Sequence, residues 1–159
     1  MSAQYKPRVL LIGNFLSQSR SGSQGVCEDL SIRLLQAGWS ILTSSRRPHR
    51  LRRVADMLLT IVIKNRVYDL AVVDVYSGAA FLWAESSVLF LNKLLKPCIL
   101  VLHGGGLADF AQKHPHRVKR LLQSAQQVIT PSLFLQQELC NYRNDIQYLP
   151  NGLDLSNYP

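Results

Sequence analysis

Cysteines are few in this sequence, and their number and spacing argue against two kinds of site. Cys27, Cys98 and Cys140 are the three cysteines in 159 residues, and each lies within an apolar or helical pattern. An odd number at wide spacing is not the pattern of a disulfide framework or of a metal centre. We therefore expect three buried free thiols in a reducing compartment, and no bound metal.

Long apolar runs are also missing, which argues against a transmembrane helix. Such a helix needs about 20 consecutive, mostly apolar residues. Segment 54–63 is short and contains Asp56, and segment 79–95 is interrupted by five polar side chains. Residues 1–7 are polar and lack the apolar core of a secretory signal. We expect a cytoplasmic chain that is soluble or peripheral at the inner face of the membrane.

Acidic residues are also few: the sequence has 10 Asp and Glu and 18 Lys and Arg, which gives a net charge of +8. This surplus favours anionic partners such as phosphorylated substrates, an acidic membrane or nucleic acid. Segment 46–66 holds seven of the basic residues and one Asp, and its densest part comprises Arg46, Arg47, Arg50, Arg52 and Arg53. These arginines either contact a membrane or an anionic acceptor, or form a solvated basic loop beside a core helix.

Two recognition motifs are absent as well. Segment 14–25 is rich in serine but has only Gly22 and Gly25, so it is not the G-x-G-x-x-G loop of a dinucleotide-dependent dehydrogenase. The basic tract has no interleaved aromatic residues and no nucleic-acid-binding motif, which disfavours nucleic acid as a partner. His114 and His116 flank Pro115 and cannot share a helix face, so a metal site is not expected there either.

What the sequence does contain is a regular alternation of short apolar runs with amphipathic stretches. The runs predict six strands, at residues 8–13, 39–44, 68–75, 97–102, 127–130 and 146–149. Helical spacing predicts helices from 26 to 38, over 54–63 and 79–95, and from 132 to about 140. The alternation predicts an α/β protein: a Rossmann-like, doubly wound parallel sheet of about six strands, in one domain over 1–159.

The strand at 97–102 leads into the most informative motif. Its five apolar residues follow Pro97 and precede a histidine and three glycines, which is typical of a strand buried on both faces. His103 falls at the carboxyl end of this strand, where ligands of doubly wound sheets bind. The glycines at 104–106 would let the backbone approach a ligand closely. The pattern indicates either a ligand-binding histidine or a satisfied histidine beside an ordinary glycine turn.

Four segments together resemble the N-terminal domain of retaining glycosyltransferases with the GT-B fold, of the family 4 type (group 1 relatives). They are the helix at 30–38, the strand at 96–103 that ends in His-Gly, the strand and helix at 125–139, and the tail at 148–159. Each motif alone is of moderate specificity, but together they have the order and spacing of that family and cover essentially the whole chain.

The sequence departs from the family pattern at three places. Ser21-Gly22 stands where the first loop usually has Gly-Gly, and Trp39 stands where a His usually follows the first helix. The third strand ends in Asp74-Val75-Tyr76, where a His is common. The first of these departures weakens the expected phosphate contact in that loop.

The resemblance implies transfer of a sugar from a nucleotide-diphosphate donor to a carbohydrate or lipid-linked acceptor, with retained anomeric configuration and without a metal. His103 would lie near the transferred sugar and hydrogen-bond to it or stabilise charge. Backbone N–H groups of Ser21, Gly22 and Ser23 would approach the donor diphosphate. The other implied roles are a sugar pocket at Gly104 and Gly105, a turn at Asn151 and Gly152, and a membrane or anionic acceptor beside the arginines of 46–53.

In that family a second domain carries most of the nucleotide-sugar site, and nothing within 1–159 resembles it. We therefore expect this chain to be the acceptor-side half of such an enzyme, with little or no activity alone and no cofactor. The alternative is a stand-alone Rossmann-like module that binds a lipid headgroup, a sugar or a partner subunit. An in-frame α/β domain encoded after Pro159 would favour the first interpretation.

Overall fold

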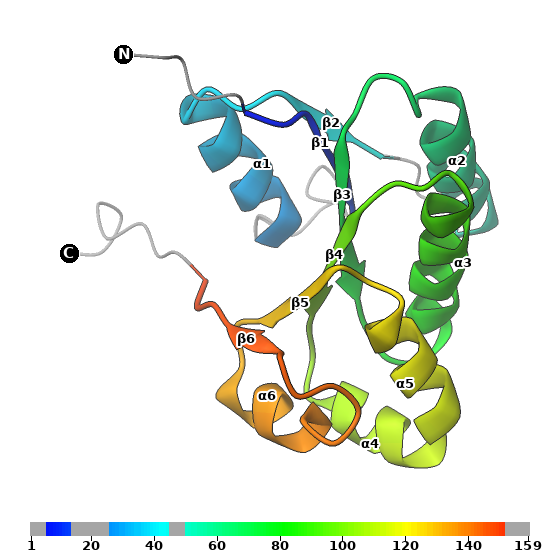
Figure 1. Cartoon of the computed structure of the whole chain (residues 1–159), viewed down its shortest axis with the longest axis vertical. Coiled ribbons are helices and arrows are strands. Elements are labelled where there is room, and N and C mark those ends of the chain that lie inside the picture. Colours follow the sequence, from blue (N-terminus) through cyan, green and yellow to red (C-terminus); the bar gives the residue numbers. More distant parts are fainter. Residues whose placement is uncertain (1–5, 14–25, 45–49, 152–159) are drawn as a thin grey trace.

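The computed structural model describes residues 6–13, 26–44 and 50–151, and of residues 26 and 50–53 it describes the backbone alone. In this part of the chain six strands form one sheet in which every neighbouring pair is parallel (Figure 1). They are β1 (Val9–Ile12), β2 (Ile41–Thr43), β3 (Leu70–Val75), β4 (Cys98–Leu102), β5 (Gln127–Thr130) and β6 (Gln147–Tyr148). The predicted fold class, a Rossmann-like doubly wound parallel sheet, is confirmed.

The strands lie in the order β2-β1-β3-β4-β5-β6. The chain moves from β1 out to β2, returns past β1 to β3, and then adds each later strand beside the one before. Parallel strands need long crossover connections, which helices provide. The helices are α1 (Val26–Gln36), α2 (Arg50–Ile63), α3 (Ala79–Lys93), α4 (Gly106–Lys113), α5 (Pro115–Gln123) and α6 (Leu133–Leu139). The direction reverses between β1 and β3, which makes this the topological switch point where ligands of open α/β sheets bind.

The reversal places helices on both faces of the sheet. Figure 1 shows α1 on one side and α2, α3 and α5 on the other. The main core includes Leu10 of β1 and Met57 of α2, whereas the smaller core under α1 contains Leu11 and Cys27. Neighbouring residues of β1 thus enter different cores, because successive side chains of a strand lie on opposite faces. This explains why β1 is apolar throughout.

Strand β3 shows the same alternation but carries a carboxylate on one face. Ala71, Val73 and Val75 are buried in the main core. Asp74 lies between them and therefore on the opposite face, the one that α1 packs against. In the sheet register Asp74 pairs with Val101 of β4. Asp74 and the residue after β4, His103, consequently share a face at the carboxyl edge of the sheet.

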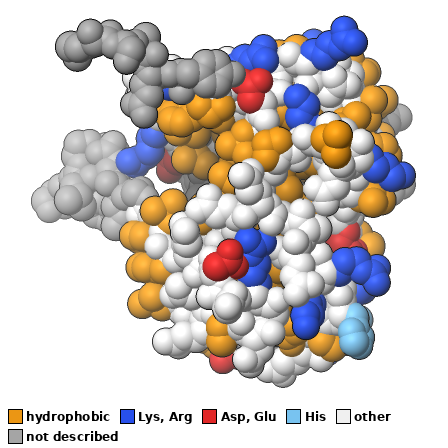
Figure 2. Space-filling model, viewed as in Figure 1, with side chains coloured by type: hydrophobic (Ala, Val, Ile, Leu, Met, Phe, Trp, Pro, Cys, Tyr) orange, Lys and Arg blue, Asp and Glu red, His pale blue; other side chains and the backbone are white. Residues whose placement is uncertain are grey.

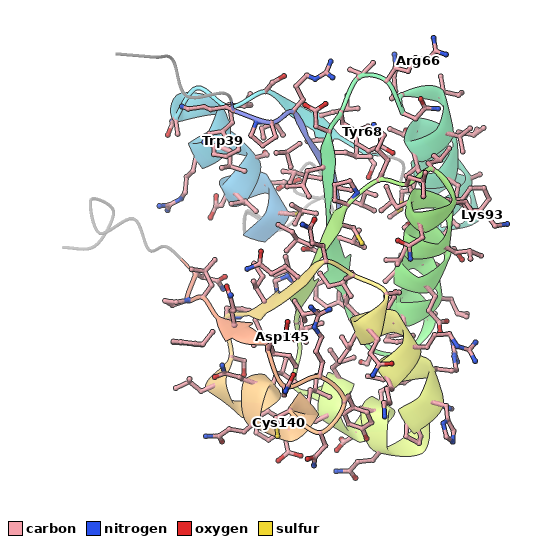
Figure 3. The ribbon with its side chains drawn as sticks, viewed as in Figure 1. Trp39, Arg66, Tyr68, Lys93, Cys140 and Asp145 are labelled. Carbon is pink, nitrogen blue, oxygen red and sulfur yellow. The ribbon has the colours of Figure 1, made fainter. Side chains whose placement is uncertain are left out.

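One prediction about the cysteines is wrong. Cys27 and Cys98 are buried free thiols, but Cys140 is exposed (Figure 3). Cys140 ends α6, whose buried residues are Leu135 and Leu139. Successive residues of a helix are rotated by about 100°, so the position after Leu139 turns away from the core side.

Helices α1 and α3 end in the same hydrogen-bonded turn, but with different residues at its critical position. In both turns a backbone N–H donates at 2.9 Å to the carbonyl five residues earlier, Trp39 to Leu34 and Lys96 to Leu91. This bond is typical of the Schellman motif, in which the residue before the donor has positive φ and is usually Gly. Helix α1 has Gly38 there with a φ of 76°, whereas α3 has Leu95 with a φ of 54°.

We predict that Leu95→Gly raises the free energy of unfolding by about 1 kcal/mol, because the left-handed conformation is unfavourable for a residue with a side chain. Leu95 is 90% exposed, so the substitution removes almost no packing. Urea unfolding of the two proteins measures the difference. The reciprocal change Gly38→Leu should lower stability. An unchanged or lower stability of Leu95→Gly would contradict the strain that we infer.

Candidate functional site

Asp74 and His103 meet at the carboxyl edge of the sheet. The Nε2 atom of His103 lies 3.2 Å from Oδ1 of Asp74, and the two side chains are only 8% and 6% exposed. The backbone N–H of His103 donates to the carbonyl of Val75 at 2.9 Å, which continues the ladder between β3 and β4 past the last residue of β4. The sheet register therefore fixes the position of both members of the pair.

This contact decides which ring nitrogen of His103 faces a ligand. A carboxylate bonded to one nitrogen favours the tautomer with its proton there and holds the ring in one orientation. Because Nε2 contacts Asp74, Nδ1 is the ring nitrogen left for another partner. In the neutral ring Nδ1 can accept a hydrogen bond, for example from a hydroxyl group. The pair can thus bind an alcohol and stabilise positive charge that develops on the imidazole.

Tyr76 forms a wall of the site. Its ring stacks on the His103 ring, with centroids 5.0 Å apart and an interplanar angle of 19°. Burial, followed by the negative charge of Asp74, raises the pKa of Tyr76 to about 12. The phenol therefore stays neutral at ordinary pH, where it can donate a hydrogen bond.

Gly13 allows Asp74 to occupy its place. A side-chain Cβ at position 13 would lie 2.4 Å from Oδ2 of Asp74 and 2.5 Å from Sγ of Cys27. The Cys27 thiol hydrogen-bonds to Asp74, and burial, together with that carboxylate, raises the pKa of Cys27. Cys27 thus serves as a neutral donor to the carboxylate and is not poised as a thiolate nucleophile.

A cavity of about 150 Å³ lies beside this pair, at the switch point between β1 and β3. It is lined by side chains of two strands, the residues that follow them and helices α2 and α3: Ile12, Gly13, Met57, Val73, Asp74, Tyr76, Ala80, Trp83 and Ala84. Most of these side chains are apolar, and Asp74 and Tyr76 contribute the polar atoms. Sites for whole small molecules commonly span about 300–1,000 Å³. This cavity therefore has room for a small group, not for a nucleotide.

The glycines after His103 turn the chain sharply into α4. Gly104 has a φ of 80°, a conformation that residues with side chains rarely adopt. A Cβ at Gly105 would meet no atom within 4 Å. Gly106 is the first residue of α4, and the N–H of Leu107 in its first turn donates to the carbonyl of Gly104 at 3.1 Å. Gly104 and Gly105 thus adjoin His103 at the same edge, while their contact with a sugar remains a prediction.

The other residues predicted for the site lie elsewhere or outside the described residues. Ser21, Gly22, Ser23, Arg46 and Arg47 lie outside them. Arg50, Arg52 and Arg53 belong to the first turn of α2, of which the backbone alone is described. Asn151 is exposed and follows β6, two strands away from β4.

Asp74, Tyr76 and Gly13 belong to the candidate site, and the sequence prediction did not select them. Asp74 carries a recognisable signal, because it is the one charged residue in the apolar strand Leu70–Val75. Gly13 follows a strand, which is common for glycine. The role of Gly13 depends on how closely Asp74 and Cys27 approach it, and no local pattern specifies that distance.

Neither a metal cluster nor a membrane-spanning helix is found in the described part of the chain. Within 6–13, 26–44 and 50–151, no three His, Cys, Asp or Glu side chains are placed to hold a metal ion. In the same ranges no helix has both the length and the hydrophobicity needed to cross a bilayer.

Comparison with known proteins assigns no family to this chain. No protein-family model matches the sequence, and no curated protein is significantly similar to it.

We predict that Gly13→Ala lowers the free energy of unfolding by about 1–3 kcal/mol, as is typical when a methyl group is forced into a packed site. Chemical denaturation measures the loss. Gly105→Ala is the matched control, since a Cβ there meets open space and its stability should change little. Adding Cys27→Ala to Gly13→Ala should recover part of the loss, because one of the two clashing atoms is removed. Equal stability of the two alanine variants would contradict this packing.

We predict that the protein loses stability as the pH rises from about 10, the ordinary tyrosine pKa, towards 12. Burial also raises the pKa of Tyr68 to about 12, so both phenols keep their protons in the fold at pH values where the unfolded chain has lost them. A raised pKa stabilises the fold below the unfolded value, and that stabilisation disappears as the folded groups titrate. Ultraviolet absorbance should show two late-titrating phenols, one of which disappears in Tyr68→Phe and one in Tyr76→Phe. Titration of all tyrosines near pH 10 would contradict the prediction.

Proposed function

We propose that this chain is the acceptor-side half of a retaining glycosyltransferase that uses a nucleotide-diphosphate sugar. The observation that carries the proposal is the buried Asp74–His103 pair beside the cavity at the switch point. Open α/β sheets bind their ligands at this position. The resemblance of the His-Gly strand and of the tail to family 4 glycosyltransferases supports the same assignment.

In this proposal an acceptor inserts a small apolar part between Met57 of α2 and Trp83 of α3, which line the cavity. One of its hydroxyl groups then hydrogen-bonds to Nδ1 of His103, while Asp74 holds the ring and stabilises positive charge. Gly104 and Gly105 leave room for the transferred sugar. The reaction breaks the bond between the sugar and the diphosphate and forms a bond to the acceptor oxygen, and the proton of that hydroxyl passes to the departing nucleoside diphosphate.

The donor requires more surface than the described residues provide. A cavity of about 150 Å³ is too small for a nucleotide sugar. Backbone N–H groups of Ser21, Gly22 and Ser23 would contact one side of the diphosphate, and a second domain would supply the rest of the site. The arginines of 46–53 would face an anionic, lipid-linked or phosphorylated acceptor. We therefore propose a metal-independent transfer that this chain does not perform alone.

Trp83 provides a direct test, because it lines the cavity and the chain has only one other tryptophan, Trp39. In a Trp39→Phe variant we expect alkyl glycosides or short polyprenyl phosphates to change Trp83 emission, and nucleotide sugars to bind weakly or not at all. His103→Ala should weaken acceptor binding about fivefold to tenfold, the effect of one lost hydrogen bond. His116→Gln, which changes an exposed histidine elsewhere, is the control.

Two results would overturn the proposal. Tight nucleotide-sugar binding with sugar transfer by this chain alone would contradict a half-site, and no response of Trp83 to any acceptor would contradict an acceptor pocket. A stand-alone binding module would also bind an acceptor and change Trp83 emission, but it would take no part in sugar transfer. An in-frame α/β domain encoded after Pro159 would favour the transferase, and its absence would favour the module.

A further inference from the structure

The outer faces of α2 and α3 form a second surface, separate from the Asp74–His103 edge. The two helices pack side by side against the sheet. Helix positions three or four residues apart share a face, and beside Asp56, Ser86 and Lys93 several outward positions here are apolar. They are Leu59, Val62 and Ile63 of α2 and Leu82 and Leu89 of α3, which are between 39% and 69% exposed. A helix on the surface of a soluble protein usually carries polar residues at such positions, so a partner is indicated.

The turns that follow these helices extend the apolar surface. Lys96, in the turn after α3, donates from Nζ to the carbonyl of Tyr68 at 2.9 Å and lies 5.1 Å from the centre of the Tyr68 ring. This contact holds the turn after α3 against the turn after α2. Val67 is 46% exposed in one turn, and Leu95 is 90% exposed in the other.

Leu95 combines exposure with backbone strain. Its φ of 54° is suited to Gly, as the equivalent Gly38 of α1 illustrates. The exposed side chain of Leu95 gains no packing energy in the fold, and its backbone is strained. A contact between this side chain and a partner outside the chain would explain both observations. Strain of this kind is a separate observation from the apolar helix faces.

Basic side chains surround the apolar positions. Lys64, Arg66 and Lys93 are exposed, and Figure 3 shows Arg66 and Lys93 on the side of the molecule formed by α2 and α3. The neighbouring acids Asp69 and Glu85 are neutralised by ion pairs with Arg8 and Arg117. Orange and blue side chains predominate along this edge in Figure 2. The surface is therefore apolar with a positive border.

We propose that this surface, the outer faces of α2 and α3 with the two turns that follow them, binds an anionic lipid bilayer. Apolar side chains would enter the boundary between headgroups and acyl chains, and the basic side chains would contact the anionic headgroups. A second copy of the chain fits less well, because the same positive border would be present on both contacting surfaces. The proposal does not depend on sugar transfer at the Asp74–His103 edge.

Vesicle sedimentation tests the proposal with the whole chain. We expect binding to phosphatidylcholine vesicles that contain phosphatidylglycerol, much weaker binding to phosphatidylcholine alone, and weaker binding in added salt. Lys64→Gln and Arg66→Gln should each weaken binding about fivefold. Ile63→Gln combined with Leu95→Gly should weaken it at least about fivefold. Leu95→Gly alone should weaken vesicle binding while making the fold more stable, which loss of structure cannot explain.

Matched variants away from this surface are the controls. Leu35→Gln in α1 and Leu133→Gln in α6 change leucines that are 55% and 53% exposed, and Lys113→Gln changes an exposed lysine of α4. All three should bind vesicles as the unaltered chain does. Equal binding of neutral and anionic vesicles, or equal losses in the control variants, would overturn the proposal. A dimer in solution that Ile63→Gln and Leu95→Gly abolish, without vesicle binding, would overturn it in favour of a second copy.

Discussion

The carboxylate of Asp74 is the group around which the carboxyl edge of the sheet is arranged. A charged group removed from water is costly unless hydrogen bonds compensate it. His103 and Cys27 supply such contacts from β4 and α1, and the absence of a side chain at Gly13 lets them converge. Tyr76 then covers the imidazole. An apolar strand has no structural need of a carboxylate at this point, and this supports the proposal that Asp74 takes part in a ligand site.

The carboxyl edge of the sheet can bind part of a ligand, but it does not provide a complete site for the proposed reaction. The cavity admits a small group, and the Asp74–His103 pair lies beside it. The cavity at this edge is too small to surround a diphosphate or a base. A site divided between two domains is common where a reaction must exclude water, since closure then assembles the complete site. The proposed acceptor half follows this logic.

The two proposed surfaces have a simple spatial relation. Helices α2 and α3 each follow a strand and run back along the sheet, so they begin near the carboxyl edge and end at the opposite one. If their outer faces lie along a bilayer, the strands lie roughly along it too, and the carboxyl edge faces sideways, within reach of the membrane surface. A lipid-linked acceptor could approach Asp74 and His103 from there without leaving the bilayer.

Local pattern was sufficient to predict all six strands and the parallel α/β class, because apolar runs of strand length and helical spacing follow directly from side-chain burial. Local pattern was insufficient for helix ends and side-chain contacts that depend on residues far apart in the sequence. The helix at 79–95 ends at Lys93, because the Schellman turn and the Lys96–Tyr68 contact end it. Strand order alone brings Asp74 against His103, 29 residues later, and sets Gly13 against both Asp74 and Cys27. Sequence by itself determined the six strands, four of the six described helices and the fold class, but α4 and α5 were not predicted. Only the tertiary structure decided which strand ends meet, since that depends on how the helices pack on each face.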